Sequence, residues 1–149
     1  MMSTADPFDL ERFVTAQAPV IATALAELKA GRKRSHWMWF VFPQLRGLGH
    51  SSMATFYGVA SLHEARAYLA HPVLGPRLEL CTRTVLELET GSLNEIFGSP
   101  DDVKFQSSMT LFAVARADPV NAFHQALDRW CEGAFDPLTL KLLEAGGRS

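Results

Sequence analysis

The sequence predicts an all-α protein, a compact single-domain bundle of about six to eight helices over residues 1–149. Three observations favour this class. The length of 149 residues is typical of one domain. Signals that start helices recur along the chain, and apolar residues repeat at helical rather than strand spacing. We expect the ends, residues 1–6 and 145–149, to fray.

Helix starts are marked by two local patterns. In four places an Asp or Ser that can accept a free backbone N–H precedes a proline at the first helical position: Asp6-Pro7, Ser99-Pro100, Asp118-Pro119 and Asp136-Pro137. In two more places Ser and Glu stand three residues apart, as in a capping box: Ser61 to Glu64 and Ser92 to Glu95. Local chemistry alone therefore predicts six helix starts.

Apolar stripes support the same helices. The clearest amphipathic face joins residues spaced three or four apart: Leu74, Leu78, Cys81, Val85 and Leu88. A second stripe runs from Val20 to Leu28, in a helix that should end at Gly31. Because proline disrupts a helix interior, Pro19 predicts a break between this helix and the preceding segment 8–17.

The segment GRKRSHWMWFVFPQ, residues 31–44, joins three cations to a run of aromatic residues. Alternation from His36 to Phe42 would suit a buried strand, but no second run offers a partner strand. Since unpaired buried backbone groups are costly, we predict a short helix here. The next stretch, QLRGLGHSS at residues 44–52, predicts an irregular loop that either faces a ligand or simply connects two helices.

The composition argues against several classes of protein. A net charge of −2 argues against general nucleic-acid binding. No segment approaches the ~20 apolar residues that span a membrane, and the N-terminus lacks the pattern of a signal peptide, so we expect a cytoplasmic location. Cys81 and Cys131 are predicted to be reduced core thiols. The spacing of the histidines and the missing catalytic motifs predict neither a metal site nor a cofactor.

The cationic and aromatic segment contains the first candidate site residues. Arg34 and its neighbours, with Ser35 as a helix cap, would form an anion site, or they would only complement the end of the preceding helix. Trp37 and Trp39 would stack on the flat ring of a ligand, or they would pack in the hydrophobic core. His36 would act as an acid or base, or it would make a structural hydrogen bond.

The stretch SPDDVKFQSSMTLFAV, residues 99–114, is apolar on nearly every side and therefore predicts a buried helix. Its hydroxyl groups would bond the carbonyl four residues back, or they would face a polar pocket. Lys104 and Ser108 are four residues apart and therefore lie on the same face of this predicted helix, where a lysine–hydroxyl pair could form. We predict His36, Asp102, Lys104 and Ser108 as catalytic candidates. The predicted ligand-binding residues are Arg34, Ser35, His36, Trp37, Trp39, Gln44, Lys104 and Ser108.

Three stretches carry a family resemblance: GRKRSHWMWFVFPQLRGLG, FYGVASLHEARAYLAHPVLGPRL and SPDDVKFQSSMTLFAVA. From about Phe8 to Leu143 the chain resembles the bacterial domain-of-unknown-function family numbered 1810. The resemblance implies a mainly helical single domain and brings no established activity or catalytic residue. Members are sometimes labelled calpastatin-like, but calpastatin is a disordered inhibitor that folds on binding, whereas this chain is capped and apolar.

The sequence is compatible with two functions. The first is a pocket for a nucleotide-like or other anionic ring ligand. An enzyme of this kind would be a hydrolase or transferase on ADP-ribose-type compounds, because the order of aromatic, helical and Lys-Phe segments is similar to that of the NADAR proteins. The alternative is a protein–protein interaction module without catalysis, anchored by its aromatic residues. The first function requires residues 31–44 and 99–114 to meet around a shared hollow.

Overall fold

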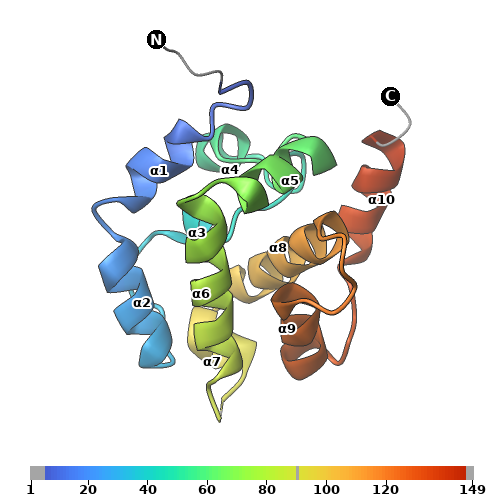
Figure 1. Ribbon diagram of the computed structural model, residues 1–149. Coiled ribbons are helices and arrows are strands. Elements are labelled where there is room, and N and C mark those ends of the chain that lie inside the picture. Colours follow the sequence, from blue (N-terminus) through green and yellow to red (C-terminus); the bar gives the residue numbers. More distant parts are fainter. Residues whose placement is uncertain (1–5, 90, 147–149) are drawn as a thin grey trace.

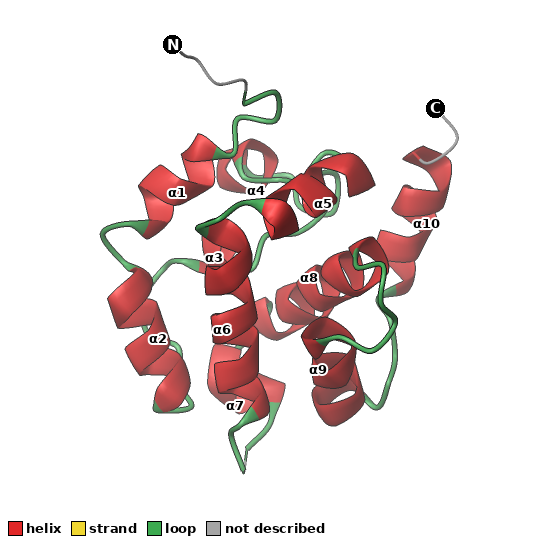
Figure 2. Ribbon diagram, in the orientation of Figure 1, coloured by secondary structure: helices red, strands yellow, loops and turns green. Residues whose placement is uncertain are grey.

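A computed structural model describes residues 6–89 and 91–146, and within these ranges every regular element is a helix (Figures 1 and 2). The predicted all-α class is therefore confirmed. The helices are α1 (Glu11–Gln17), α2 (Ile21–Lys29), α3 (Met38–Val41), α4 (Ser52–Phe56), α5 (Leu62–Ala70), α6 (Leu74–Leu86), α7 (Leu93–Phe97), α8 (Asp101–Ala115), α9 (Ala122–Cys131) and α10 (Pro137–Gly146).

The number of helices was predicted slightly too low, since the described residues contain ten rather than six to eight. The excess comes from short elements, because α3 has 4 residues and α4 and α7 have 5 each. A single turn is too short to show a 3.6-residue repeat, so apolar spacing does not separate such helices from loops. The predicted break at Pro19 is confirmed, because α1 ends at Gln17 and α2 begins at Ile21.

Three of the six predicted helix starts are confirmed with their caps. The Ser61 hydroxyl accepts the Glu64 N–H at 3.2 Å at the start of α5, and Ser92 accepts the Glu95 N–H at 3.2 Å at the start of α7. Asp136 accepts the Thr139 N–H at 3.1 Å at the start of α10. These caps satisfy backbone donors that have no partner inside the helix.

The other three predicted starts are wrong in position. Asp6 accepts two backbone N–H groups, but α1 begins only at Glu11. Asp118 accepts the Val120 N–H at 2.9 Å within a turn, and Asn121 caps α9 instead. Pro100 takes the N-cap position of α8, without a side-chain cap. Asp or Ser before proline favours turns as well as helix starts, and here the turns prevail.

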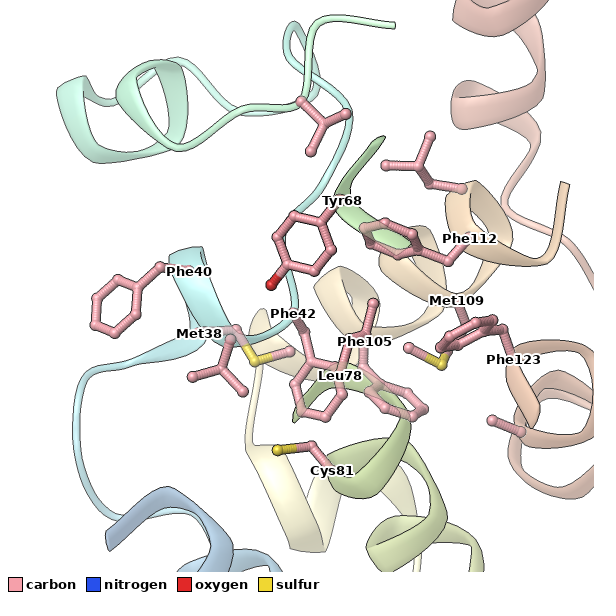
Figure 3. Packing of buried hydrophobic residues seen from close by; sticks show 14 of the residues in the cluster. Met38, Phe40, Phe42, Tyr68, Leu78, Cys81, Phe105, Met109, Phe112 and Phe123 are labelled. Atoms are coloured by element: carbon pink, nitrogen blue, oxygen red, sulfur yellow. The ribbon is translucent and has the colours of Figure 1, made fainter. Parts of the chain in front are cut away.

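Helix α8 is the centre of the fold and packs against α5, α7, α9 and α10, while α6 packs against α2, α5 and α9 (Figure 1). The predicted burial of α8 is confirmed by nine buried residues along its 15. Its aromatic side chains meet Phe42, which follows α3, and Tyr68 of α5 in the core, where Phe105 contacts Phe42 and Phe112 contacts Tyr68 (Figure 3). The N-terminal half of the chain is thereby joined to the C-terminal half.

The predicted irregular loop lies between α3 and α4, although α4 already begins at Ser52. An isolated bridge between Leu45 and Val59 fixes the beginning of this loop to the segment after α4. Val59 donates its N–H to the Gln44 carbonyl at 2.8 Å, and Arg46 donates its N–H to the Val59 carbonyl at 2.7 Å. None of the helices in the described ranges has the length and apolar character needed to cross a membrane.

Candidate functional site

The cationic and aromatic segment does lie against the first turns of α8. The Lys33 ammonium is 2.9 Å from an Asp101 carboxylate oxygen. The rings of Phe42 and Phe105 meet edge to face with centroids 5.1 Å apart. The two segments singled out in the sequence are therefore neighbours in space, and each candidate side chain can be placed on the core side or the surface side of their contact.

Trp37 lies on the core side. It is 0% exposed, and its ring packs against Phe42 with centroids 6.3 Å apart. Its indole N–H donates to the Glu27 carboxylate at 2.9 Å. The indole thus has its one polar group bonded within the protein and no face open to water, so the structure supports the core interpretation of this residue.

Glu27, on α2, holds the start of the segment in place. Its carboxylate also accepts the N–H groups of Arg34 and Ser35 at 2.8 and 3.0 Å and the Ser35 hydroxyl at 2.6 Å. Burial alone would raise the pKa of Glu27, but the hydrogen bonds from Ser35, Arg34 and Trp37 outweigh it and lower the pKa to about 2. Glu27 is therefore an ionised clamp, and Ser35 is one of its donors.

A charged cluster joins the segment to α8. The Asp101 carboxylate lies between two ammonium groups, 2.9 Å from Lys33 and 3.5 Å from Lys104. The Lys33 side chain is 8% exposed and that of Lys104 is 26% exposed. Because two cations share one carboxylate, the cluster retains a positive charge, and the more exposed lysine presents it to solvent.

Trp39 lies on the surface side of the same contact. It is half-buried, and the Lys104 ammonium is 5.5 Å from its ring centroid. This is within the range of a cation–π interaction. Arg34 and His36, earlier on the segment, are both exposed. Trp39 and Lys104 are thus the predicted binding residues that combine direct contact with access to solvent.

Two of the hydroxyl groups on α8 hold the helix and its neighbour together. Ser107 donates to the Val103 carbonyl and to the Asp136 carboxylate, each at 3.1 Å. Thr110 donates to the Gln106 carbonyl at 2.8 Å and accepts the Asp136 N–H at 2.9 Å. The interpretation that these hydroxyls bond the carbonyl four residues back is confirmed for both residues, and Asp136 links them to the start of α10.

Ser108 is the exception on α8. Its side chain is 0% exposed, and its hydroxyl has no hydrogen-bond partner in the described part of the chain. Lys104 turns instead to Asp101 and Trp39, so the Lys–hydroxyl pair that their spacing allows is not formed. Gln44 is half-buried, and its backbone carbonyl serves the bridge to Val59.

A shallow groove lies apart from Trp39, and Asp102 alone of the predicted site residues lines it. It holds about 260 Å³ and is bounded by Leu93, Asp102, Val103, Gln106, Trp130, Cys131 and Glu132. Trp130 and Glu132 were not among the site residues predicted from the sequence. The two adjacent aspartates therefore belong to different surfaces, Asp101 to the charged cluster and Asp102 to the groove.

Neither cysteine is activated as a nucleophile. Burial raises the pKa of Cys81 to about 12 and that of Cys131 to about 11. Both therefore remain protonated thiols at neutral pH, and the thiolate is the reactive form. The prediction of reduced thiols agrees with the structure, in which both cysteines are free, Cys81 buried and Cys131 half-buried.

The fold and these surfaces define a helical protein with an aromatic and cationic face beside its central helix. The chain belongs to the family described as protein of unknown function (DUF1810), whose model matches residues 7–143, and the predicted resemblance is thereby confirmed. It is similar to the crystal structure of the conserved hypothetical protein Rv1873 from Mycobacterium tuberculosis. The identity is 57% with a TM-score of 0.91, over 93% of this chain and 99% of that one. A comparison with curated proteins found no match.

Proposed function

We propose that the surface around Trp39 and Lys104 binds a nucleotide-like or other anionic ring compound. The observation that carries the proposal is the Lys104 ammonium, which lies 5.5 Å from the centroid of a half-buried indole ring. The ring of a ligand would stack on Trp39, and its phosphate or carboxylate would pair with Lys104. Stacking of a base on an aromatic side chain contributes about 1–3 kcal/mol.

The charges around Trp39 support an anion as the partner. Lys104 shares Asp101 with Lys33, and Lys33 is the nearer of the two lysines, at 2.9 Å against 3.5 Å. An incoming anion would therefore meet an ammonium whose charge is only partly neutralised. Arg34 is exposed on the adjoining segment and would extend the positive field toward the ligand.

The remaining predicted residues take supporting roles in this proposal. Trp37 and Ser35 bind Glu27 and fix the backbone from which Trp39 projects. Ser108 lies inside the core. Gln44 stays a predicted binding residue. The proposal covers binding alone, and hydrolase or transferase chemistry on ADP-ribose-type compounds stays a prediction from the sequence.

A titration with ADP, NAD and ADP-ribose tests the proposal, with intrinsic fluorescence and the thermal unfolding temperature as readouts. We expect at least one of these compounds to quench fluorescence and raise the unfolding temperature. Lys104→Gln and Trp39→Leu should each weaken that binding about tenfold or more. Lys141→Gln, which removes the same charge from an exposed position of α10, should leave it unchanged. Equal binding by all three variants, or no binding of any compound to the wild type, would refute the proposal.

The alternative function, a protein interaction module, is favoured by one observation on α10. Three of its leucines are unusually open to solvent: Leu138 at 62%, Leu140 at 40% and Leu142 at 37%. Exposed apolar side chains that gather on one element are typical of interfaces. If this surface binds a second copy, light scattering should show a mass that rises with concentration and falls in Leu138→Ser. A constant monomer mass would remove self-association from this alternative.

A further inference from the structure

The groove between α7, α8 and the end of α9 combines apolar and acidic side chains in about 260 Å³. We propose that it binds a small organic cation, an ammonium or guanidinium group on a short apolar stem. The volume lies below the roughly 300–1,000 Å³ of sites for drug-sized ligands, so it suits a group the size of a single side chain. The inference does not depend on the function proposed for Trp39.

The two carboxylates of the groove carry charge that the protein leaves unneutralised. In the part of the chain that the structure describes, neither Asp102 nor Glu132 makes a salt bridge. Asp102 accepts the neighbouring Val103 N–H at 2.9 Å and the Asn94 amide at 3.3 Å, contacts that orient its carboxylate without removing its charge. Asp101, one residue earlier, shows the contrast, because it pairs with two lysines.

The apolar side chains of the groove supply contacts for the stem of the ligand. Val103 is 54% exposed, and Leu93 and Trp130 are half-buried beside it. The Trp130 indole N–H donates to the Val85 carbonyl at 3.3 Å, so the ring meets a ligand through its carbon atoms. An alkyl stem against these groups and a cationic head between two carboxylates would match the groove in both polarity and charge.

Arg129, which precedes Trp130 on α9, has its guanidinium engaged by other groups. Arg129 lies over Trp130, with its guanidinium 4.4 Å from the ring centroid, and donates to the Leu88 carbonyl at 2.7 Å. Within the described residues its guanidinium forms no salt bridge with Asp102 or Glu132. Its contact with Trp130 also shows that this indole accepts a cation against its face, as indoles generally do.

Glu132 offers an informative variant because of its backbone. It ends α9 in the left-handed region, with φ of 55°, where glycine is the favoured residue. Glu132→Gly should therefore raise the thermal unfolding temperature while it removes a carboxylate from the groove. Loss of binding together with a gain of stability would not be explained by a purely structural role.

The experiment uses Cys131 as a reporter in the full chain. Cys131 lines the groove and is half-buried, whereas Cys81 is 0% exposed, so a thiol reagent added to the native protein labels mainly Cys131. The probes are n-butylammonium and n-butylguanidinium, with n-butanol and pentanoate as controls of the same n-butyl stem. We expect the cations to slow labelling in a saturable manner, the controls to have little effect, and added salt to weaken the protection.

Variants make the test specific. Asp102→Asn and Glu132→Gly should each raise the half-maximal concentration for protection about tenfold. Glu11→Gln, an exposed carboxylate on α1 away from the groove, should leave it unchanged. Equal protection by n-butanol and n-butylammonium, or unaltered protection in both groove variants, would overturn the proposal, as would no protection by either cation.

A final measurement distinguishes a small free cation from a cationic side chain of a partner protein. A blocked arginine tripeptide that protects Cys131 at lower concentration than n-butylguanidinium would assign the groove to a protein side chain. The reverse order would assign it to a small metabolite. Both outcomes support a cation site, and they differ only in the source of the cation.

Discussion

Trp37 and Trp39 stand two residues apart and lie in opposite environments. Trp37 is fully buried, and its indole N–H is bonded to Glu27. Trp39 is half-buried beneath Lys104, whose carboxylate partner is shared with a second lysine. The first region has its polar groups bonded within the protein, which is typical of structural positions. The second retains a partly exposed indole and an excess cation, which is typical of a binding surface.

The largest effect should come from the buried member of the pair. Trp37→Ala should lower the free energy of unfolding by about 3–5 kcal/mol, because it opens a large cavity and leaves Glu27 without one of its donors. Chemical denaturation of the purified variant measures this loss. A loss below about 1 kcal/mol would mean that Trp37 is not a core residue and would break the contrast with Trp39.

The clamp beneath Trp37 should give the next largest effect. Glu27→Gln should cost about 2 kcal/mol, because hydrogen bonds to a charged group contribute roughly 1.5–3 kcal/mol. The folded-state pKa of Glu27 is lowered from 4.5 to about 2, so its contribution is fully present above pH 4.5 and is lost as pH falls from 4.5 toward 2. Unfolding curves across this range should fall less steeply for the variant than for the wild type. Identical curves would contradict the clamp.

Ser108, in the core, should have a smaller effect on the free energy of unfolding than its neighbour Ser107. Ser108→Ala should leave the free energy of unfolding unchanged or raise it by up to about 1 kcal/mol, because it removes a buried hydroxyl that has no partner among the residues the structure describes. Ser107→Ala is the matched control on the same helix and should lower stability by about 1 kcal/mol, since Ser107 bonds both Val103 and Asp136. A loss of equal size in the two variants would show that Ser108 has a partner after all.

The smallest effect on stability should come from Trp39. Trp39→Leu should cost less than about 1 kcal/mol, because the side chain is only half-buried and its cation–π partner Lys104 is partly exposed. Thermal unfolding without ligand measures this cost, and ligand titration of the same sample measures binding. A loss of stability as large as that of Trp37→Ala would place both tryptophans in the core.

The fold class could be predicted from the sequence because it depends on short-range signals. The caps at Ser61, Ser92 and Asp136 act over three residues and need no tertiary contact. The same signals misplaced the starts of α8 and α9, where Ser99 and Asp118 precede proline in turns. Local patterns thus recognise a chain reversal or a helix start, but they do not always separate the two.

The candidate site could be predicted only in part. The meeting of residues 31–44 with α8 was expected from the residue types, and the structure brings Lys33 to Asp101 and Trp39 to Lys104. The groove of about 260 Å³ is not the shared hollow expected between these segments, because no residue of 31–44 lines it. The different burial of Trp37 and Trp39 could not be predicted, because consecutive apolar residues have no periodicity that shows which side chains face the core. The groove was missed because its walls come from α7, α8 and α9, which only the tertiary structure brings together.

The most direct test of the proposed binding surface observes the tryptophans separately. The chain has three tryptophans, so the ¹⁵N-labelled protein gives three indole N–H signals that single substitutions can assign. On titration with ADP-ribose, or with whichever of ADP and NAD binds more tightly, the account predicts a saturable shift of the Trp39 signal with little change at Trp37 and Trp130. Binding without a shift at Trp39, or with the main shift at Trp37, would contradict it.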